Sequence, residues 1–186
     1  MRLFTAVVPP PEVVDHLRGA LPASAPAGVR WAEPETWHVT LGFHGDVPEG
    51  ALDELVEGLA AAASEVDPFP IHLAGAGTFS GRTVWVGVGG AVPGLQALVA
   101  GVRTAARAVG LPDDARLRAR HHVTVARATR PGGATVAADL VRALAVYRGP
   151  HWEVTRITLV ESPLGEGRSG GPRHVDLADL PLRGGA

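Results

Sequence analysis

The sequence predicts an α+β fold, in which strands and helices follow one another and several strands form hairpins. Three observations lead to this fold class. Seven short segments are rich in Val, Thr, Phe and Trp, four longer segments carry apolar residues at helical spacing, and turn residues separate neighbouring segments. The chain has 186 residues, of which 46% are hydrophobic, which is enough for one domain or two small, tightly packed lobes.

The first half of the chain begins with an expected strand over residues 2–8, followed by a helix over 11–21 that three prolines open. A second strand is expected over 36–43. A helix over 49–65 follows, because Leu52, Leu55, Val56 and Leu59 have the i, i+3, i+4, i+7 spacing of a helix that lies on a sheet. The residues 28–30 between the first helix and the second strand are expected to form a turn.

The second half continues the same alternation. Strands are expected over 69–79, 83–89, 121–127, 152–162 and 173–178, and helices over 93–109 and 134–147. The Gly- and Arg-rich stretch over 165–173 is expected to be a mobile loop between the last two strands. No long linker divides the chain, so we treat residues 1–186 as one domain.

The composition excludes several classes of chemistry and location. Cysteine is absent, which removes disulfides and thiolate catalysis and is compatible with a reducing cytoplasm. Lysine is also absent, which removes a lysine nucleophile or Schiff base. No apolar run approaches the ~18 residues of a membrane helix. The formal net charge of −2 does not supply the broad basic surface that coats long nucleic acid, although seven arginines fall within residues 101–130 and could hold a small anion.

One tetrad occurs twice in strand-like sequence: His38-Val39-Thr40-Leu41 and His122-Val123-Thr124-Val125. Side chains at positions i and i+2 of a strand point to the same face. The histidine and the threonine of each copy are therefore expected on one face, with the two aliphatic residues in an apolar layer behind them. If the two strands lie near each other, two imidazoles and two hydroxyls converge on one groove.

Such a groove suits phosphoryl chemistry. One imidazole can be neutral and accept a proton while the other is protonated and donates one. Threonine hydroxyls can bind the non-bridging oxygens of a phosphate, where charge must be stabilised. A structural role for each histidine remains open. A metal site would need a third ligand, and the sequence contains no HExxH motif, His-x-His motif or cysteine pair, so we expect neither a metal ion nor another cofactor.

The two tetrads and the segments around them resemble the two-histidine (2H) phosphoesterase superfamily, and within it the RNA 2′,3′-cyclic phosphodiesterases, also called 2′-5′ RNA ligases. The resemblance covers nearly the whole chain. It includes the opening segment "RLFTAVVPPPEV", the first motif block over 29–47, the hairpin "GTFSGRTVWVGV", the second motif "HHVTVAR" and the segment "ITLVESPLGEG".

This resemblance implies a bilobal fold with pseudo-two-fold symmetry, one motif in each lobe and a central groove. It implies metal-free hydrolysis of a 2′,3′-cyclic phosphate at an RNA end, which leaves a 2′-phosphate. By motif match, His38 and His122 are the catalytic pair, Thr40 and Thr124 bind the phosphate, and Arg127 contacts the substrate. We assign His122 as the base and His38 as the acid, although pseudo-symmetric motifs cannot settle that order.

Three positions depart from the pattern of this superfamily. His121 stands where proline is usual, His44 where leucine is usual, and a common tyrosine near the C-terminus is replaced around Arg173 and His174. His44 has the same strand parity as His38, so it is expected to line the groove, and Phe43 is a candidate for stacking on a base. Arg127 has the opposite parity and reaches the groove only if the strand bends or ends near Ala126.

Rival functions remain open at the level of the sequence. The groove could bind RNA ends or nucleotides without physiological turnover, or it could act on another cyclic nucleotide or a 2′-5′-linked oligonucleotide. Two intact His-x-Thr motifs favour an enzyme, because binding a phosphate does not require two histidines. The expected partners are RNA ends or cyclic-phosphate nucleotides, without a membrane, and the chain is expected to be a cytoplasmic monomer.

Overall fold

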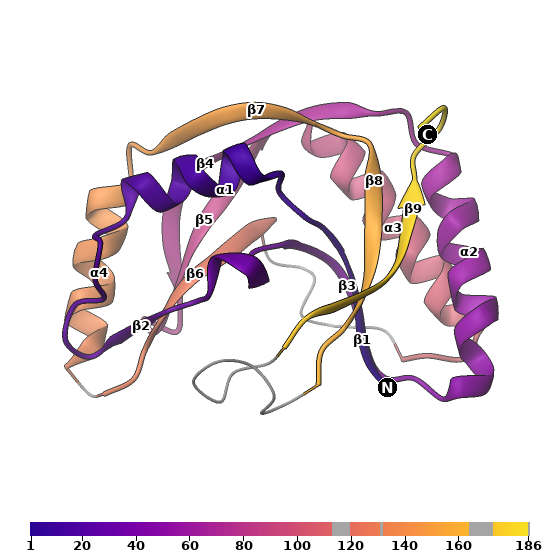
Figure 1. Ribbon diagram of the computed structural model, residues 1–186, viewed down its shortest axis with the longest axis horizontal. Helices are drawn as coiled ribbons and strands as arrows, with labels where there is room; N and C mark the ends of the chain where they lie inside the picture. Colours follow the sequence, from indigo (N-terminus) through magenta and orange to yellow (C-terminus); the bar gives the residue numbers. More distant parts are fainter. Residues whose placement is uncertain (113–119, 131, 164–172, 186) are drawn as a thin grey trace.

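A computed structural model provides the structure of the chain and describes residues 1–112, 120–130, 132–163 and 173–185. In this part of the chain, four α-helices flank two antiparallel sheets (Figure 1). The predicted α+β class is confirmed. No helix within the described residues is long and apolar enough to cross a membrane.

The smaller sheet has the strand order β3-β1-β8-β9, and every neighbouring pair is antiparallel. Its strands are β1 (Arg2–Val7), β3 (Val39–Asp46), β8 (Arg156–Glu161) and β9 (Val175–Pro181). The helices α2 (Leu52–Ser64) and α3 (Val92–Ala108) pack on the side of this sheet at the right of Figure 1.

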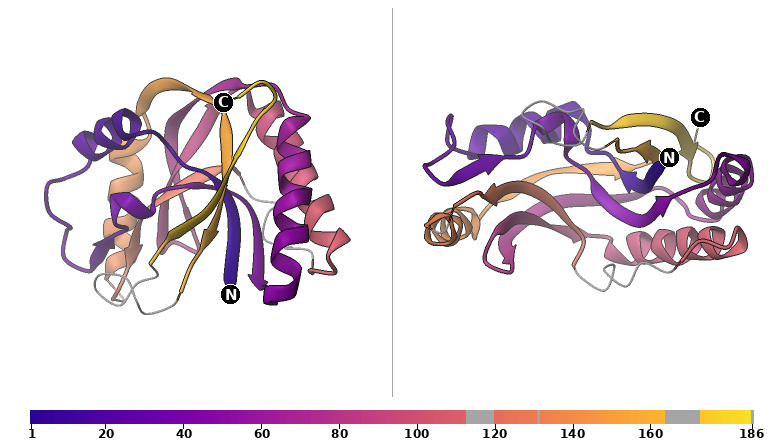
Figure 2. Two further views of the ribbon diagram at one scale, coloured as in Figure 1. Left: turned by 45° about the vertical axis from the view of Figure 1, so that its right-hand side comes forward. Right: turned by 90° about the horizontal axis from the view of Figure 1, so that it is seen from below.

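The larger sheet has the order β2-β6-β5-β4-β7, again with antiparallel neighbours only. Its strands are β2 (Val29–Trp31), β4 (Phe69–Phe79), β5 (Thr83–Gly90), β6 (His122–Ala128) and β7 (Arg148–Val154). The helices α1 (Pro11–Ala20) and α4 (Gly133–Leu144) pack against it. Figure 2 shows the two pairs of helices at opposite ends of the molecule, with the strands between them.

The two sheets repeat one arrangement. The order β3-β1-β8-β9 corresponds to β6-β5-β4-β7, and β2 is added outside β6. In both sheets the strand that carries a His-x-Thr motif comes first in this order. The pseudo-two-fold arrangement that the resemblance implies is therefore present in the topology, with one motif strand in each sheet.

Small residues let α2 and α3 approach each other closely. A Cβ atom on Gly101 of α3 would lie 2.8 Å from the Cβ of Ala62 on α2, and one on Gly58 of α2 would lie 3.1 Å from the Cβ of Ala105 on α3. Leu55 and Leu59 of α2 point into the core, as the predicted helical stripe requires. This close helix pair supports the sheet that carries the first motif.

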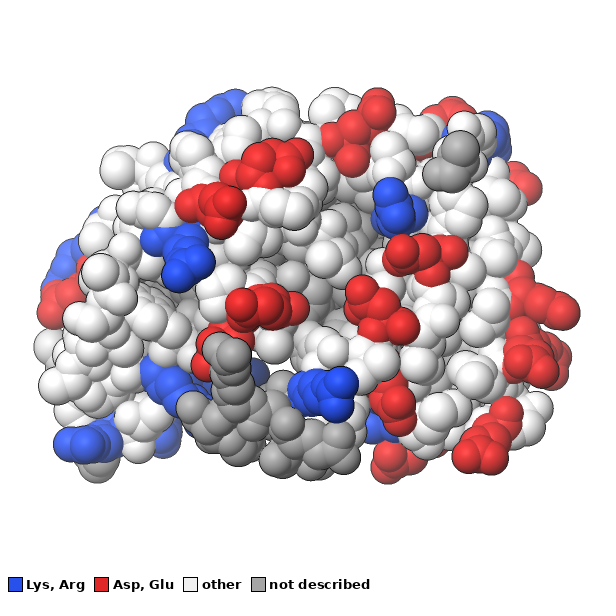
Figure 3. Space-filling view, viewed as in Figure 1, with Lys and Arg blue, Asp and Glu red and all other residues white. Residues whose placement is uncertain are grey.

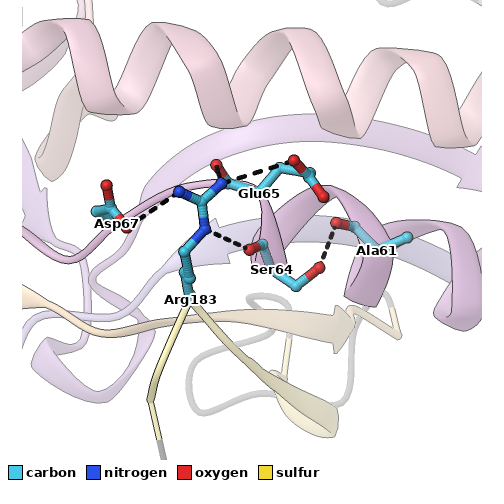
Figure 4. A network of polar contacts seen from close by, with 5 residues as sticks. All are labelled: Ala61, Ser64, Glu65, Asp67 and Arg183. Carbon is cyan, nitrogen blue, oxygen red and sulfur yellow. Dashed lines mark hydrogen bonds and ion pairs between the residues drawn. The ribbon is translucent and has the colours of Figure 1, made fainter.

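An arginine after β9 fastens the C-terminal segment to the end of α2 (Figure 4). Arg183 donates hydrogen bonds from Nη2 to the carbonyl of Glu65 at 2.7 Å and from Nε to the carbonyl of Ser64 at 3.3 Å. It also pairs with the carboxylate of Asp67 at 3.4 Å. A cation at the C-terminus of a helix satisfies its last carbonyls and complements the helix dipole.

The sequence prediction differs from the structure in two places. Of residues 28–30, expected to be a turn, Val29 and Arg30 belong to β2, because Val29, Arg30 and Trp31 pair with β6. The single strand expected over 152–162 is divided at Thr155 into the ends of β7 and β8, which belong to different sheets. The expected loop over 165–173 lies outside the described residues apart from Arg173.

Candidate active site

Strands β3 and β6 lie next to each other where the two sheets meet, so the two motifs share one region of the molecule (Figure 1). The face seen in Figure 3 is hollowed in its middle, between the sheets. Acidic side chains crowd the right margin of that face, over α2. A charge on His122 contributes to lowering the pKa of His38, which places the two imidazoles within electrostatic range of each other.

The eight residues from His38 and the eight from His122 repeat the same pattern of burial. In each stretch the histidine and the threonine are half-buried, the residues between and after them are buried, and the sixth residue is exposed. Val39, Leu41, Val123 and Val125 have no exposed surface and belong to the core. The two threonines therefore face the groove, as strand parity predicts.

A β-bulge follows the threonine in both motif strands. Thr40 and Gly42 pair with consecutive residues of β1, which leaves Leu41 as the extra residue, and Thr124 and Ala126 pair with consecutive residues of β5, which leaves Val125. A bulge shifts the alternation of the strand by one residue. It brings Phe43 and Arg127, each five residues after its motif histidine, to the face that carries the histidines and threonines.

This bulge resolves the parity problem of Arg127. Its partners across the sheet are Thr83 on β5 and Arg30 on β2. Ala126 and Ala128, on either side of it, are buried in the opposite face, and Arg127 itself is exposed. Arg127 therefore points to the face of Thr124.

The same bulge overturns the position expected for His44. This side chain is only 3% exposed, and its Nε2 lies 2.8 Å from the hydroxyl of Thr5, which is fully buried. Leu3 and Val7, the alternate neighbours of Thr5 along β1, belong to the core. The expectation that His44 lines the groove is wrong, because Leu41 and His44 are both extra residues in the pairing of β3 with β1.

Both motif histidines are held by the same hydrogen bond. His38 Nδ1 lies 2.7 Å from the carbonyl oxygen of Thr36, and His122 Nδ1 lies 2.7 Å from the carbonyl oxygen of Arg120. In each case the acceptor is two residues before the histidine. Since a carbonyl can only accept, Nδ1 must carry the proton and donate it. This leaves Nε2 of each ring to give or take a proton.

Aromatic rings surround His38 on the side of the smaller sheet. Its ring centroid lies 4.5 Å from that of Phe4 and 5.2 Å from that of His174, which meets it edge to face. Phe4 also contacts His174 at 5.0 Å and Phe43 at 5.8 Å. These contacts hold the imidazole in place and place a third imidazole beside the catalytic candidate.

His122 has its own aromatic wall on the larger sheet. Phe79 meets it edge to face at 4.8 Å, and Trp85 lies 6.0 Å away. Trp85 needs the glycine opposite it, because a Cβ on Gly77 would lie 2.2 Å from the indole ring. The indole Nε1 of Trp85 is buried and has no hydrogen-bond partner among the described residues.

Burial changes the protonation of both histidines. It lowers the pKa of His38 to about 4, against the opposing effect of the hydrogen bond to Thr36, and the charges of His174 and His122 lower it further. Burial also lowers the pKa of His122, while the bond to Arg120 opposes the change. Burial therefore favours the neutral form of both imidazoles, most strongly for His38.

Sequence reasoning missed four members of the site: Phe4, Phe79, Trp85 and His174. Phe4 and Trp85 lie on the strands directly next to β3 and β6, and His174 precedes the edge strand β9. Their closeness to the histidines depends on how the strands pair, which no local pattern reveals. The loss of the usual tyrosine near His174 was the one signal in the sequence.

The remaining candidates lie elsewhere. His121 is half-buried and lines a pocket with Val92 and Gln96 of α3 that contains neither motif histidine. Of the seven arginines in residues 101–130, Arg116 and Arg118 fall outside the described residues. Within the described part of the chain, no three His, Cys, Asp or Glu side chains are grouped so that they could hold a metal ion.

The fold and this site define a class: two antiparallel sheets that each contribute one His-x-Thr strand to a common groove. Residues 5–166 match the 2′-5′ RNA ligase superfamily. The chain therefore belongs to the 2′-5′ RNA ligase superfamily, as the resemblance of its motifs indicated.

Curated relatives agree with this assignment. The chain is 32% identical to an RNA 2′,3′-cyclic phosphodiesterase of Archaeoglobus fulgidus over 182 residues, which are 95% of this chain and 98% of that protein. It is 33% identical to an RNA 2′,3′-cyclic phosphodiesterase of Geobacillus stearothermophilus over 162 residues, or 83% of this chain. The matched part is 48% of the Geobacillus protein, so the chain spans about half of that relative.

Solved structures show the same fold. The protein TT0787 of Thermus thermophilus superposes with a TM-score of 0.77 at 27% identity, and the match covers 99% of both chains. Escherichia coli LigT in complex with 3′-AMP superposes with a TM-score of 0.71 at 25% identity, over 97% of both chains.

Proposed function

We propose that this protein hydrolyses 2′,3′-cyclic phosphates at RNA ends to 2′-phosphomonoesters, without a metal ion. The observation that carries this proposal is the pair His38 and His122, each fixed through Nδ1 at 2.7 Å and each next to a threonine on the same face. The names of the relatives, which are RNA 2′,3′-cyclic phosphodiesterases, support the substrate class.

The proposed reaction is an in-line displacement at phosphorus. Nε2 of one neutral histidine takes a proton from water, and the water oxygen forms the new bond to phosphorus. The bond from phosphorus to the 3′ oxygen breaks on the opposite side, and Nε2 of the other histidine, which is protonated, gives its proton to that oxygen. The products are a 2′-phosphate and a free 3′-hydroxyl, and the two histidines exchange protonation states.

The protonation of the site favours His38 as the base and His122 as the acid. Burial and the neighbouring imidazole charges keep His38 neutral, with a pKa of about 4, so it is ready to accept a proton. The ring of His122 is bordered by Phe79 and Trp85 and not by His174, its pKa is lowered chiefly by burial, and a bound anionic phosphate favours its protonated form. This order reverses the one that the motif resemblance suggested.

The other groove residues bind the substrate in this proposal. The hydroxyls of Thr40 and Thr124 donate hydrogen bonds to the two non-bridging oxygens, where negative charge grows in the transition state. Arg127 offers a bidentate donor to a phosphate, and Phe43, which is 38% exposed, offers a ring face to a base. Both halves of the chain contribute, so residues 1–186 act as one bilobal unit.

Two other functions use the same groove. LigT has been crystallised with 3′-AMP, with ATP and with NADP+, so a relative accommodates several nucleotides. A different cyclic nucleotide or a 2′-5′-linked oligonucleotide would require the same pair of histidines. A binding module without turnover would use the threonines and Arg127, but it would not require two histidines with Nε2 left for proton transfer.

The test is hydrolysis of an RNA oligonucleotide that ends in a 2′,3′-cyclic phosphate, in the presence of EDTA, with the product isomers separated. We expect full activity in EDTA and a 2′-phosphate product. Loss of activity in EDTA with recovery on adding a divalent ion would reject the metal-free mechanism. Binding of the oligonucleotide without any hydrolysis would favour the binding module. Activity only on other cyclic nucleotides or 2′-5′ linkages would show that the proposed substrate is wrong and that one of these is the substrate.

A further inference from the structure

The catalytic groups of this site are nearly the same when the two halves are exchanged. His38 and His122 have the same hydrogen bond to the carbonyl two residues before, at the same distance of 2.7 Å. The two threonines have the same burial and the same bulge after them. The hydrogen bonds and bulges of this set are therefore the same in both directions along the groove.

A 2′,3′-cyclic phosphate is itself nearly symmetric at the reacting centre. Phosphorus carries two ester bonds to neighbouring oxygens of one ribose, and breaking either bond opens the ring. Breaking the bond to the 3′ oxygen leaves a 2′-phosphate, and breaking the bond to the 2′ oxygen leaves a 3′-phosphate. The bond that breaks is the one whose oxygen faces the acid and lies opposite the water. The orientation of the ribose in the groove therefore decides the product.

The equivalent positions that break the symmetry are Phe43 and Arg127. Both stand five residues after the motif histidine, both are brought to the groove face by the bulge, and both are exposed. One is an aromatic ring packed next to Phe4, at 5.8 Å between centroids, and the other is a cation on the face of Thr124. A base stacks on a ring, and a phosphate binds a guanidinium.

We propose that Phe43 and Arg127 determine which ester bond is broken, by fixing the direction of the terminal nucleotide in an otherwise symmetric groove. This inference rests on the proposed function. Phe43 holds the terminal base on the side of the smaller sheet, and Arg127 holds the phosphate on the 5′ side of that nucleotide on the larger sheet. The nucleotide then presents its 3′ oxygen, and not its 2′ oxygen, to the acid.

The position of Arg127 fits a phosphate of the RNA backbone. Thr124 and Arg127 pair with Trp85 and Thr83, which are two residues apart on β5, so at ~3.3 Å per residue Arg127 stands roughly 7 Å along the strand from Thr124. Arg30 stands directly opposite Arg127 on β2 and is exposed on the same face, about one strand spacing of ~4.8 Å away. Two guanidinium groups on one face give this part of the sheet the positive charge that attracts a second phosphate.

The test measures the ratio of 2′- to 3′-phosphate products from a short RNA oligonucleotide with a 2′,3′-cyclic phosphate end. The variants are Phe43→Ala, Arg127→Ala and the double change, with Phe43→Leu and Arg127→Gln as milder substitutions in case a variant does not fold. The matched control is Arg103→Ala, which removes one positive charge from the exposed face of α3. Thermal unfolding checks that each variant is folded.

We expect the wild-type protein and Arg103→Ala to give one isomer. The share of the 3′-phosphate should rise by roughly tenfold or more in each single variant, which is the scale of one charged hydrogen bond or one stacked ring, and further in the double variant. The inference is overturned if the folded variants turn over more slowly but keep the same isomer as purely as the wild type. An inactive wild type would instead reject the proposed function, so the two failures are distinct.

Discussion

Strands β3 and β6 carry the same His-x-Thr motif with the same local geometry. They differ in the side chains that surround this shared motif. Each presents a half-buried histidine and threonine, then a bulge at the fourth residue of the tetrad. Beside His38 lie Phe4 and His174, whereas beside His122 lie Phe79 and Trp85. In the proposed mechanism, the shared parts suit the chemistry common to both histidines, and the differences decide which histidine is the base, which is the acid and how the substrate is oriented.

Replacing the two motif histidines should have the largest effect on turnover. His38→Ala and His122→Ala should each lower kcat by roughly 10²–10⁴, the usual contribution of a general base or acid. The double variant should lose less than the product of the two losses, because the groups act as one unit. Steady-state kinetics on a 2′,3′-cyclic phosphate measure this, with His16→Ala as the control, since His16 lies on α1 and its Nδ1 contacts the hydroxyl of Tyr147. Near-normal turnover in both single variants would show that the pair is not catalytic.

The pH dependence of activity should reveal that the pKa values of the two histidines are lowered together. Burial lowers the pKa of both, to about 4 for His38, so the free protein loses its protonated histidine as the pH rises toward neutrality. Because kcat/KM reports the free enzyme, its bell-shaped profile should have its maximum below pH ~6.5, the ordinary pKa of histidine. A maximum at about pH 8 or above would contradict the burial of the pair.

Replacing His174, the third imidazole near the site, should have a smaller effect on activity. His174→Phe keeps a ring against His38 and Phe4 but removes a charge that lowers the pKa of His38. The pKa of His38 should therefore rise, and the acid limb of the kcat/KM profile should move to higher pH, with kcat lowered by less than about tenfold. NMR titration of the His38 ring checks the same shift. An unchanged acid limb would limit His174 to packing.

The smallest effect on activity is expected at His44, which the bulge turns into the core. His44→Leu leaves the buried hydroxyl of Thr5 without this partner, which costs about 1–3 kcal/mol of stability. Denaturant unfolding measures the loss, and the double variant Thr5→Val/His44→Leu should recover part of it. Turnover of the folded protein should stay near the wild-type value. A raised KM for His44→Leu with unchanged stability would indicate that His44 lines the groove and contacts the substrate.

The sequence predicted the α+β class, the four helices and the four motif residues, because these depend on local patterns: apolar spacing, strand alternation and a repeated tetrad. It placed His44 wrongly, and it made the direction of Arg127 depend on a bend, because strand parity assumes a regular strand. The bulges at Leu41 and Val125 shift that parity and are visible only in the pairing with β1 and β5. It also missed His174, whose contact with His38 depends on where β9 joins the sheet.

The division of labour between the two histidines can be measured most directly with an altered leaving group. In a 2′,3′-cyclic phosphate with sulfur in place of the 3′ oxygen, the leaving thiolate needs little protonation, so the acid becomes dispensable while the base does not. We predict that this substrate restores most of the turnover of His122→Ala and little of that of His38→Ala. Equal rescue of both variants, or of neither, would contradict a catalytic pair in which His38 is the base and His122 is the acid.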